Sequence, residues 1–264
     1  MLTRFGVSKL PVDQFVADLH KVCGQFDVAP SEDQYLLRGT VQITQFAGIE
    51  AAHVASDLQR ITRGQQAIRT DPGENYFLVL QEEGRALMSQ NDTTCLLHPG
   101  DMLLVDSAAP SEFVFFGEYN RQLSLHLPRA EMHARFGYDL IRGGISLPRQ
   151  DPATIALCAV LAKALSQESA SAAVNSCLRE AVFGLIGVSL HERSGKETHE
   201  GVESDLAGAH ALAAAQAYIN AHYRRHDLSV QEIADDLSLS ARQIQRAFAV
   251  IGTTPTRYLL QKRL

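Results

Sequence analysis

The chain has 264 residues, of which 45% are hydrophobic, and a formal net charge of −6. This composition excludes an intrinsically disordered protein, and the length allows one or two domains. The N-terminus lacks an apolar signal core and no apolar run reaches the length of a membrane span, so we expect a cytoplasmic protein without membrane contacts.

A short amphipathic helix is predicted for residues 11–23. Val12, Phe15, Val16 and Leu19 recur there at helical spacing on one face. We expect this face to pack on the segment that follows.

Residues 36–127 have the pattern of many short strands. Alternating apolar segments are separated by turn-forming sequences such as 71–73 (Asp-Pro-Gly), 83–84 (Glu-Gly) and 98–101 (His-Pro-Gly-Asp). The predicted strands cover residues 39–46, 49–54, 61–65, 75–81, 86–90, 94–97, 102–106, 112–116 and 122–127. Short strands at such even spacing predict a β-barrel or a double-sheet jelly roll.

Two apolar helices are predicted next, at 152–166 and 172–192. The first places Ile155, Leu157 and Leu161 along one side, and the second does the same with Val174 and other aliphatic residues. Both are more apolar than a helical pair that only covers a barrel requires. A contact between two copies of the chain and a simple cover are both open interpretations.

Residues 194–208 are polar, charged and contain glycine, which predicts a linker and a domain boundary. A helix over 209–222 then opens the second domain.

Residues 229–255 have the spacing of two short helices. Ser229 has the capping position before a helix at 230–237, and Ser240 has it before a second helix at 241–251. Residues 238–239 leave room only for a turn, and Ala234 lies where the two helices would cross. This is a helix-turn-helix pattern, although a plain helical hairpin has the same spacing.

The second of these helices carries polar side chains on its outer face. They are Arg242, Gln243, Gln245 and Arg246. Arginine and glutamine match the donor and acceptor patterns of guanine and adenine edges in the major groove. Residues 209–264 carry a net charge of +3 and the rest of the chain −9, so the positive charge accompanies the predicted reading helix.

Residues 228–263 resemble the first helix-turn-helix of the AraC/XylS family of bacterial transcription regulators. The matching residues are Ala234, Leu237, Ser240, Ile244, Arg246, Phe248, Gly252, Pro255, Tyr258 and Arg263. The resemblance implies that the second helix enters the major groove. It also implies a joining helix, for which 256–264 is the start, and a second helix-turn-helix, which is absent from this sequence. The DNA-binding domain is therefore expected to be incomplete here, through truncation or natural shortening.

The strand region supports the same resemblance. Residues 98–106 resemble the turn and following strand of the cupin-like sensor domains that precede the DNA-binding part in the family, and the layout is similar to the XylS-like branch. The implied fold is α+β and multidomain. Its parts are a cupin-like β-barrel or jelly-roll sensor at 1–150, an α-helical dimerisation element at 151–193, the linker at 194–208 and the helix-turn-helix at 209–264.

The resemblance assigns roles to the polar residues of the last domain. Arg242, Gln245 and Arg246, with Gln243 beside them, are expected to approach DNA bases. Phosphate contacts are expected from Arg257, Lys262 and the helix starts at Ser229 and Ser240.

Ligand contacts in the barrel are expected from aromatic residues and one cation. They are Arg38, Phe46, Tyr76, Phe77, Phe113 and Phe115. Ordinary core packing is the alternative role for each of them. A small aromatic compound or a carboxylate is the inducer that the resemblance implies.

Metal binding is not expected. Cupin enzymes hold a metal with two closely spaced histidines, a glutamate and a third histidine, and no His-x-His occurs here. His53, His98 and His126 lie far apart, and Glu112 has no histidine near it. His98 is expected to be a turn residue, and His126 a strand histidine that is hydrogen-bonded in the sheet. The four cysteines also lack metal-ligand spacing and are expected to be buried or half-buried thiols: Cys23, Cys95, Cys158 and Cys177. We expect no metal, no cofactor and no enzymatic activity.

These observations predict a ligand-responsive, DNA-binding transcription regulator of a catabolic operon. Its expected partners are double-stranded DNA, a small organic effector, a second copy bound through 151–193, and RNA polymerase. The alternative is a ligand-binding, dimerising protein that does not bind DNA because the second helix-turn-helix is missing.

Overall fold

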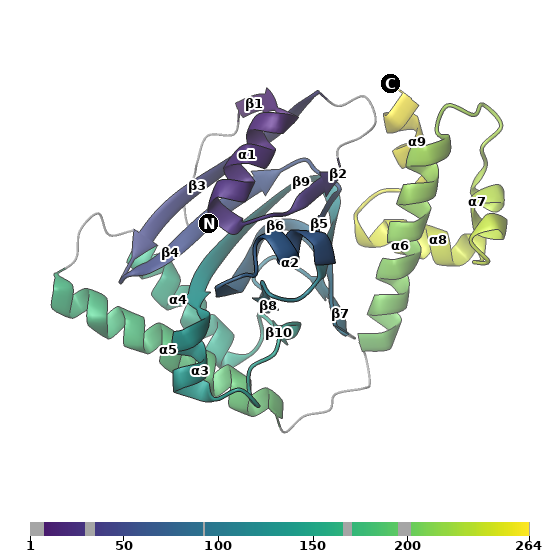
Figure 1. Cartoon of the computed structure of the whole chain (residues 1–264). Coiled ribbons are helices and arrows are strands. Elements are labelled where there is room, and N and C mark those ends of the chain that lie inside the picture. Colours follow the sequence, from purple (N-terminus) through teal and green to yellow (C-terminus); the bar gives the residue numbers. More distant parts are fainter. Residues whose placement is uncertain (1–7, 30–34, 92, 166–170, 195–201, 264) are drawn as a thin grey trace. The chain divides into compact units, whose positions relative to one another are not determined.

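The structure, a computed structural model, describes residues 8–29, 35–91, 93–165, 171–194 and 202–263 (Figure 1). It divides into two compact units, Met1–Glu197 and Thr198–Leu264, called unit 1 and unit 2 below. The strands are β1 (Ser8–Pro11), β2 (Asp27–Ala29), β3 (Leu36–Phe46), β4 (Ile49–Ser56), β5 (Arg60–Arg63), β6 (Asn75–Gln90), β7 (Thr93–Leu97), β8 (Met102–Asp106), β9 (Ser111–Pro128) and β10 (Ile145–Leu147). The helices are α1 (Val12–Cys23), α2 (Gln65–Thr70), α3 (Arg129–Phe136), α4 (Pro152–Leu165), α5 (Ala172–Ser194), α6 (Val202–His222), α7 (Val230–Asp236), α8 (Ala241–Val250) and α9 (Pro255–Arg263).

Unit 1 is built on an antiparallel sheet in the order β1-β3-β4-β9-β6-β8-β10. The long strands β6 and β9 pair with each other along nearly their whole length, from Asn75 opposite Pro128 to Gln90 opposite Ser111. Strand β5 pairs with the first half of β9, and β4 pairs with its second half. Strand β9, with its partner β6, therefore connects the part of the sheet that contains β5 to the part that contains β4.

The turn predicted at residues 83–84 is wrong, because β6 continues through it. The register between β6 and β9 shifts between Gln81 and Arg85, which marks a β-bulge. Gly84 has φ +76°, and a Cβ there would lie 2.6 Å from the carbonyl oxygen of Tyr119. A glycine in a strand can thus mark a bulge at a close backbone approach as well as a turn.

The sheet has a hydrophobic core on each face. Along β6, Tyr76, Leu78 and Leu80 enter one core, whereas Phe77 and Val79 enter the other. Helices α3, α4 and α5 contribute to the first core, and α1 contributes Phe15 and Leu19 to the second (Figure 1). The predicted helix at 11–23 and its buried face are confirmed.

The two predicted helices at 152–166 and 172–192 are confirmed as α4 and α5. Leu157 and Leu161 of α4 are buried, as are Val182 and Ile186 of α5. The prediction that Ile155 shares one side of α4 with Leu157 and Leu161 is wrong, since Ile155 is 57% exposed. Val174 of α5 is likewise 44% exposed, whereas Val182 and Ile186 are buried. Ile155 lies on the opposite side of α4 from Leu157. Because apolar residues occur on both sides of this helix, their spacing alone does not predict which side is buried.

Helix α5 also bears on the expectation that no segment is long enough to span a membrane. Residues Ala172–Arg193 are long and apolar enough to do so by length and composition alone. However, Val182, Phe183, Ile186 and Leu190 belong to the first core, as expected for a core helix of a folded unit.

Arg179 connects α5 to the sheet. Its Nη1 donates to the carbonyl oxygen of Ala47, in the turn between β3 and β4, over 3.2 Å. Its Nε donates to Oε1 of Glu131, on the helix that follows β9, over 3.3 Å. One guanidinium therefore holds the ends of two strands and α5 together.

Unit 2 contains α6 to α9. The predicted linker at 194–208 is too long, because α5 ends at Ser194 and α6 begins at Val202 instead of Ala209. A polar segment that includes Gly208 was interpreted as a linker, but a helix tolerates one glycine at a cost of about 1 kcal/mol. Residues 195–201 lie outside the described ranges.

The helix-turn-helix in unit 2 is confirmed with nearly the predicted bounds. The Ser229 hydroxyl accepts a hydrogen bond from the amide of Glu232, and Ser240 forms a capping box with Gln243. Ser238 has φ +54° in the turn, and Ala234 at the helix crossing is fully buried. These local features set the direction of α8 relative to α7.

Candidate functional site

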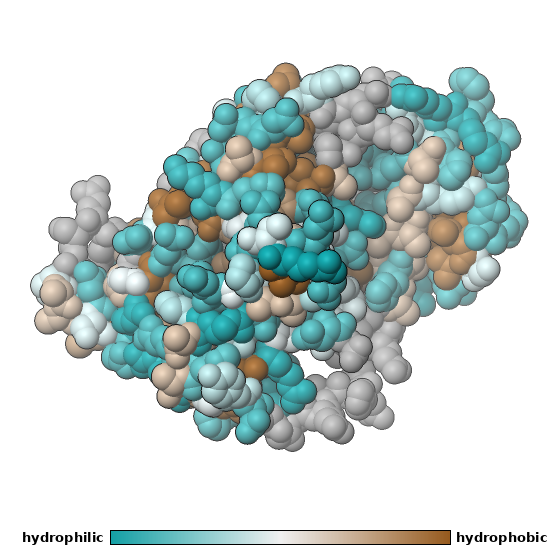
Figure 2. All heavy atoms as spheres, viewed as in Figure 1, coloured by the Kyte–Doolittle hydropathy of each residue, from teal (hydrophilic) through white to brown (hydrophobic). Residues whose placement is uncertain are grey.

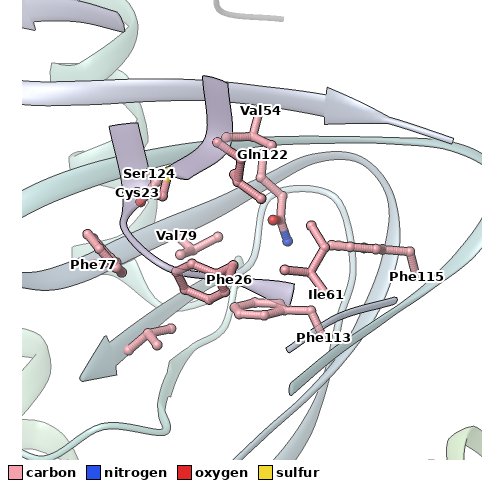
Figure 3. Close-up of a pocket in the computed structure, with 12 residues that line it drawn as sticks. Cys23, Phe26, Val54, Ile61, Phe77, Val79, Phe113, Phe115, Gln122 and Ser124 are labelled. Atoms are coloured by element: carbon pink, nitrogen blue, oxygen red, sulfur yellow. The ribbon is translucent and has the colours of Figure 1, made fainter. Parts of the chain in front are cut away.

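A cavity of about 50 Å³ lies between the sheet of unit 1 and α1 with the segment that follows it (Figure 3). Three aromatic residues predicted to contact a ligand, Phe77, Phe113 and Phe115, line it. The other lining residues are Leu19, Cys23, Phe26, Val54, Ile61, Val79, Val105, Gln122 and Ser124. All twelve lining residues are uncharged, and four of them are phenylalanines.

The other predicted ligand residues lie elsewhere. Tyr76 is on the opposite face of β6 from Phe77, and its hydroxyl lies 3.1 Å from Nε2 of His133. Arg38 is exposed, with its guanidinium over the ring of Tyr119. Phe46 ends β3, and its side chain lies outside the part of the chain that the structure describes.

The cavity has a polar wall that was not predicted from the sequence. Gln122 and Ser124 alternate along β9 with Leu123 and Leu125, which enter the other core. The side chain of Gln122 donates to Oε1 of Gln81 over 2.8 Å. The strict alternation of polar and apolar residues at 122–127 was the signal that could have identified this wall.

The thiol of Cys23 is part of the lining. Burial, with a smaller effect of the Glu50 carboxylate, raises its pKa to about 12. The thiol is therefore protonated at neutral pH and offers a ligand only a weak hydrogen-bond donor.

Metal ligands do not converge in this region. Within the described ranges, no group of three or more histidine, cysteine, aspartate or glutamate side chains could hold a metal ion. His53 is buried, and burial together with the charge of Arg121 lowers its pKa to about 4. His98 lies near Asp101 in a turn, with Nδ1 3.5 Å from the carboxylate.

Arg63 fixes the segment that covers the cavity. It is 1% exposed and donates to the carbonyl oxygens of Ser107, at 2.7 Å, and Gln25, at 2.8 Å. It also donates to the Asp71 carboxylate over 3.1 Å, and its guanidinium lies 5.4 Å from the ring centre of Phe26. Burial alone would raise the pKa of Asp71, but hydrogen bonds from the Gln25 amide and Arg63 hold it below its usual value.

The size of the cavity limits what it can hold without rearrangement. An apolar cavity of about 150 Å³ is known to bind benzene. At about 50 Å³ this cavity would have to widen to admit one aromatic ring. The covering residues Leu19, Cys23 and Phe26 lie outside the long strands, on α1 and the segment that Arg63 holds.

The outer face of α8 is the second candidate site. Arg242, Gln245 and Arg246 are exposed there, opposite the buried Ile244 and Phe248. Gln243 is exposed too, but its Oε1 accepts from the backbone amide of Ser240 over 2.8 Å, so this side chain helps to cap the helix.

The residues predicted to contact phosphates differ in their surroundings. Arg257 is exposed on α9, and Lys262 lies with Nζ 5.6 Å from the ring centre of Tyr258. The hydroxyls of Ser229 and Ser240 serve as helix caps, which fixes the helix starts that were expected to face phosphates.

Comparison with known proteins gives matches over most of the chain. Residues 17–190 match the AraC-binding-like domain family. The transcriptional activator NphR of Rhodococcus sp. is 23% identical over 264 residues, covering 95% of this chain and 74% of that protein. An uncharacterised protein from the nit 5′ region of Bacillus sp. (strain OxB-1) is 27% identical over 199 residues, covering 72% of this chain and 73% of its own length.

The solved structures that match include one that covers almost the whole chain. The AraC-like transcriptional activator CuxR superposes with a TM-score of 0.58 at 11% identity, covering 98% of this chain and 93% of that chain. It supports a cupin-like sheet followed by a helical C-terminal region. NphR and CuxR are transcriptional activators and not enzymes, in agreement with the prediction that this chain is not an enzyme.

Proposed function

The chain belongs to the AraC-binding-like domain family, and we propose on this basis that it is a cytoplasmic, ligand-responsive transcription regulator that binds double-stranded DNA. The observation that carries the proposal is the capped helix α8 with Arg242, Gln245 and Arg246 exposed on one face. Side chains of these types on a rigid helix suit base recognition in the major groove. RNA polymerase is a further proposed partner of the regulator. The surface is mostly hydrophilic on the face shown in Figure 2.

The cavity in unit 1 is proposed as the effector site. Its four phenylalanines and uncharged lining favour the aromatic inducer class over the carboxylate class. A ligand changes DNA binding only if it binds the active and inactive states of the regulator with different affinities.

Base reading predicts a specific effect of two substitutions. Gln245→Ala and Arg246→Ala are each expected to cost about 1–3 kcal/mol on the preferred site and little on random DNA. Fluorescence anisotropy, with sites selected by the whole chain from a random library, measures both affinities over a range of salt concentrations.

Arg257→Ala is the matched control for a phosphate contact. It should weaken binding to both kinds of DNA alike and reduce the salt dependence. If the α8 variants lose the same affinity on selected and random DNA, they contact phosphates and do not read bases. If the chain selects no sequence at all, the proposal of a DNA-binding regulator fails.

Homodimerisation through α5 is also proposed. Five small or aliphatic residues recur at three- and four-residue spacing on its exposed side: Ala173, Cys177, Ala181, Gly184 and Val188. Val188 is 47% exposed, and the exposure of Cys177 contradicts the expectation that every cysteine is at least half-buried. An exposed apolar stripe of small residues lets two helices approach closely, which favours the dimer interpretation over a simple cover.

A negative charge introduced into this stripe is expected to dissociate the dimer into monomers. Ala181→Glu and Val188→Glu should each shift the sedimentation coefficient of the chain from that of a dimer to that of a monomer. Gln66→Glu adds the same charge on the exposed helix α2 and should leave the dimer intact. A parent chain that is monomeric at all concentrations, or charged variants that remain dimeric, would exclude this interface.

A further inference from the structure

His126 is a buried histidine beside the cavity that the expected role of a sheet histidine does not fully explain. It is 4% exposed and lies on β9 two residues after Ser124, on the same face of the strand. Its ring centre is 4.8 Å from that of Phe77, and both Phe77 and Ser124 line the cavity. The imidazole therefore stands directly next to the cavity wall.

Within the described ranges, one of its two ring nitrogens has a hydrogen-bond partner and the other has none. Nδ1 lies 3.0 Å from Oε1 of Glu50, whereas Nε2 is buried and has no hydrogen-bond partner among the described residues. An unsatisfied buried polar atom is costly, and in a native protein it calls for a physical explanation such as a bound water or a functional contact. The Glu50 pair holds the ring in place, so Nε2 is presented in a fixed direction.

The tautomer follows from the Glu50 contact. A carboxylate can only accept a hydrogen bond, so Nδ1 carries the proton and donates it. Burial lowers the pKa of His126, although Glu50 acts in the opposite direction, and the ring is therefore neutral at neutral pH. In the neutral ring with a proton on Nδ1, Nε2 is a hydrogen-bond acceptor.

We propose that His126 Nε2 is the polar anchor of the effector site and accepts a hydrogen bond from the hydroxyl or amino group of an uncharged aromatic ligand. The inference rests on the proposed effector role of the cavity and narrows its ligand class. Phe77, beside His126, and Phe113 and Phe115 on the first half of β9 supply the surfaces for the ring. A carboxylate ligand has no hydrogen to donate to Nε2, and none of the lining residues is a cation.

The test compares ligands of matched shape by isothermal titration calorimetry on the whole chain. The probes are 4-methylphenol, which has a donor, 1,4-dimethylbenzene, which has none, and 4-methylbenzoate, which is charged. For the parent chain we expect binding of the first two compounds and none of the third.

Substitution of His126 should affect the probes differently. His126→Phe removes the acceptor and is expected to weaken 4-methylphenol about tenfold, with no loss for 1,4-dimethylbenzene. His126→Gln restores an acceptor and should recover part of that loss. His133→Phe, which alters a histidine on α3 away from the cavity lining, should leave both affinities unchanged.

Several results would overturn the inference. They are equal effects of His126→Phe on both neutral probes, tight binding of 4-methylbenzoate, or no binding of any probe to the parent chain. Circular dichroism and melting curves of each variant separate loss of folding from loss of an anchor, and His126→Gln provides a second folded variant. Sequence-specific DNA binding, measured on the same preparations, decides the proposed function independently of these probes.

Discussion

Replacing Arg63 by leucine is expected to destabilise unit 1 by about 3–5 kcal/mol, since removal of one partner leaves the other groups of a buried ionic network unpaired. The carbonyl oxygens of Gln25 and Ser107 and the Asp71 carboxylate would all lose their hydrogen bonds from Arg63, while Asp71 would keep the one from the Gln25 amide. The unit 1 transition in scanning calorimetry measures the loss. Because Phe26 depends on the same contacts, binding in the cavity should weaken as well.

Arg60→Leu is the matched control on the same strand. Arg60 pairs with Glu112 at 3.2 Å, but both side chains are about 40% exposed. Such a surface pair contributes about 0–1 kcal/mol. Similar destabilisation by the two substitutions would show that the buried network adds nothing beyond an ordinary surface pair.

The Arg63 network also has a defined pH dependence. The pKa of Asp71 in the folded chain lies below its usual value of 3.8, so the folded state binds this proton more weakly than the unfolded state. The stabilisation is therefore fully present above that pH and is lost as the pH falls through the lower, folded pKa. The difference in the free energy of unfolding between the parent chain and Arg63→Leu should be constant near neutral pH and should shrink only in acid.

Phe248→Ala is expected to remove about 3–5 kcal/mol of stability from unit 2, because it empties a fully buried position. Phe248 lies on the inner face of α8, with its ring centre 5.5 Å from that of Tyr258 on α9. A small unit has little stability to lose, so the helix-turn-helix should unfold and DNA binding should vanish on every sequence. Hydrogen exchange of the α7 and α8 amides and anisotropy with DNA measure the two effects.

Val250→Ala is the control, since Val250 is 41% exposed on the same helix and should change stability by about 0.5 kcal/mol or less. The Phe248 variant differs from the Arg246 variant, which should lose affinity while its amides remain protected. If Phe248→Ala kept both protection and DNA binding, the core of the helix-turn-helix would be assigned incorrectly.

The helix-turn-helix could be predicted closely because its signals are local. Ser229 and Ser240 cap helices through contacts only three residues away, and Ile244 and Phe248 define one buried face. No distant part of the chain has to be known for such a prediction. The outer face of α8 follows directly from the inner one.

The cavity was harder to predict because the sheet has a core on each face. Tyr76 and Phe77 are neighbours with similar side chains, and only the folded sheet shows that one meets α3 and the other the cavity. His126 was expected to be an ordinary hydrogen-bonded strand histidine. Its pairing with Glu50, 76 positions away in sequence, depends on the register of β4 and β9, which local patterns do not contain.

Arg179 connects the proposed effector site to the proposed dimer helix. The turn that it holds begins β4, which carries Glu50, and Glu131 follows β9, which carries His126. If a ligand at His126 shifts the position of α5 through these contacts, and thereby the strength of the dimer, thermodynamic reciprocity requires dimer formation to change ligand affinity by the same factor. The effector response would then depend on the cellular abundance of the regulator as well as on the concentration of the effector.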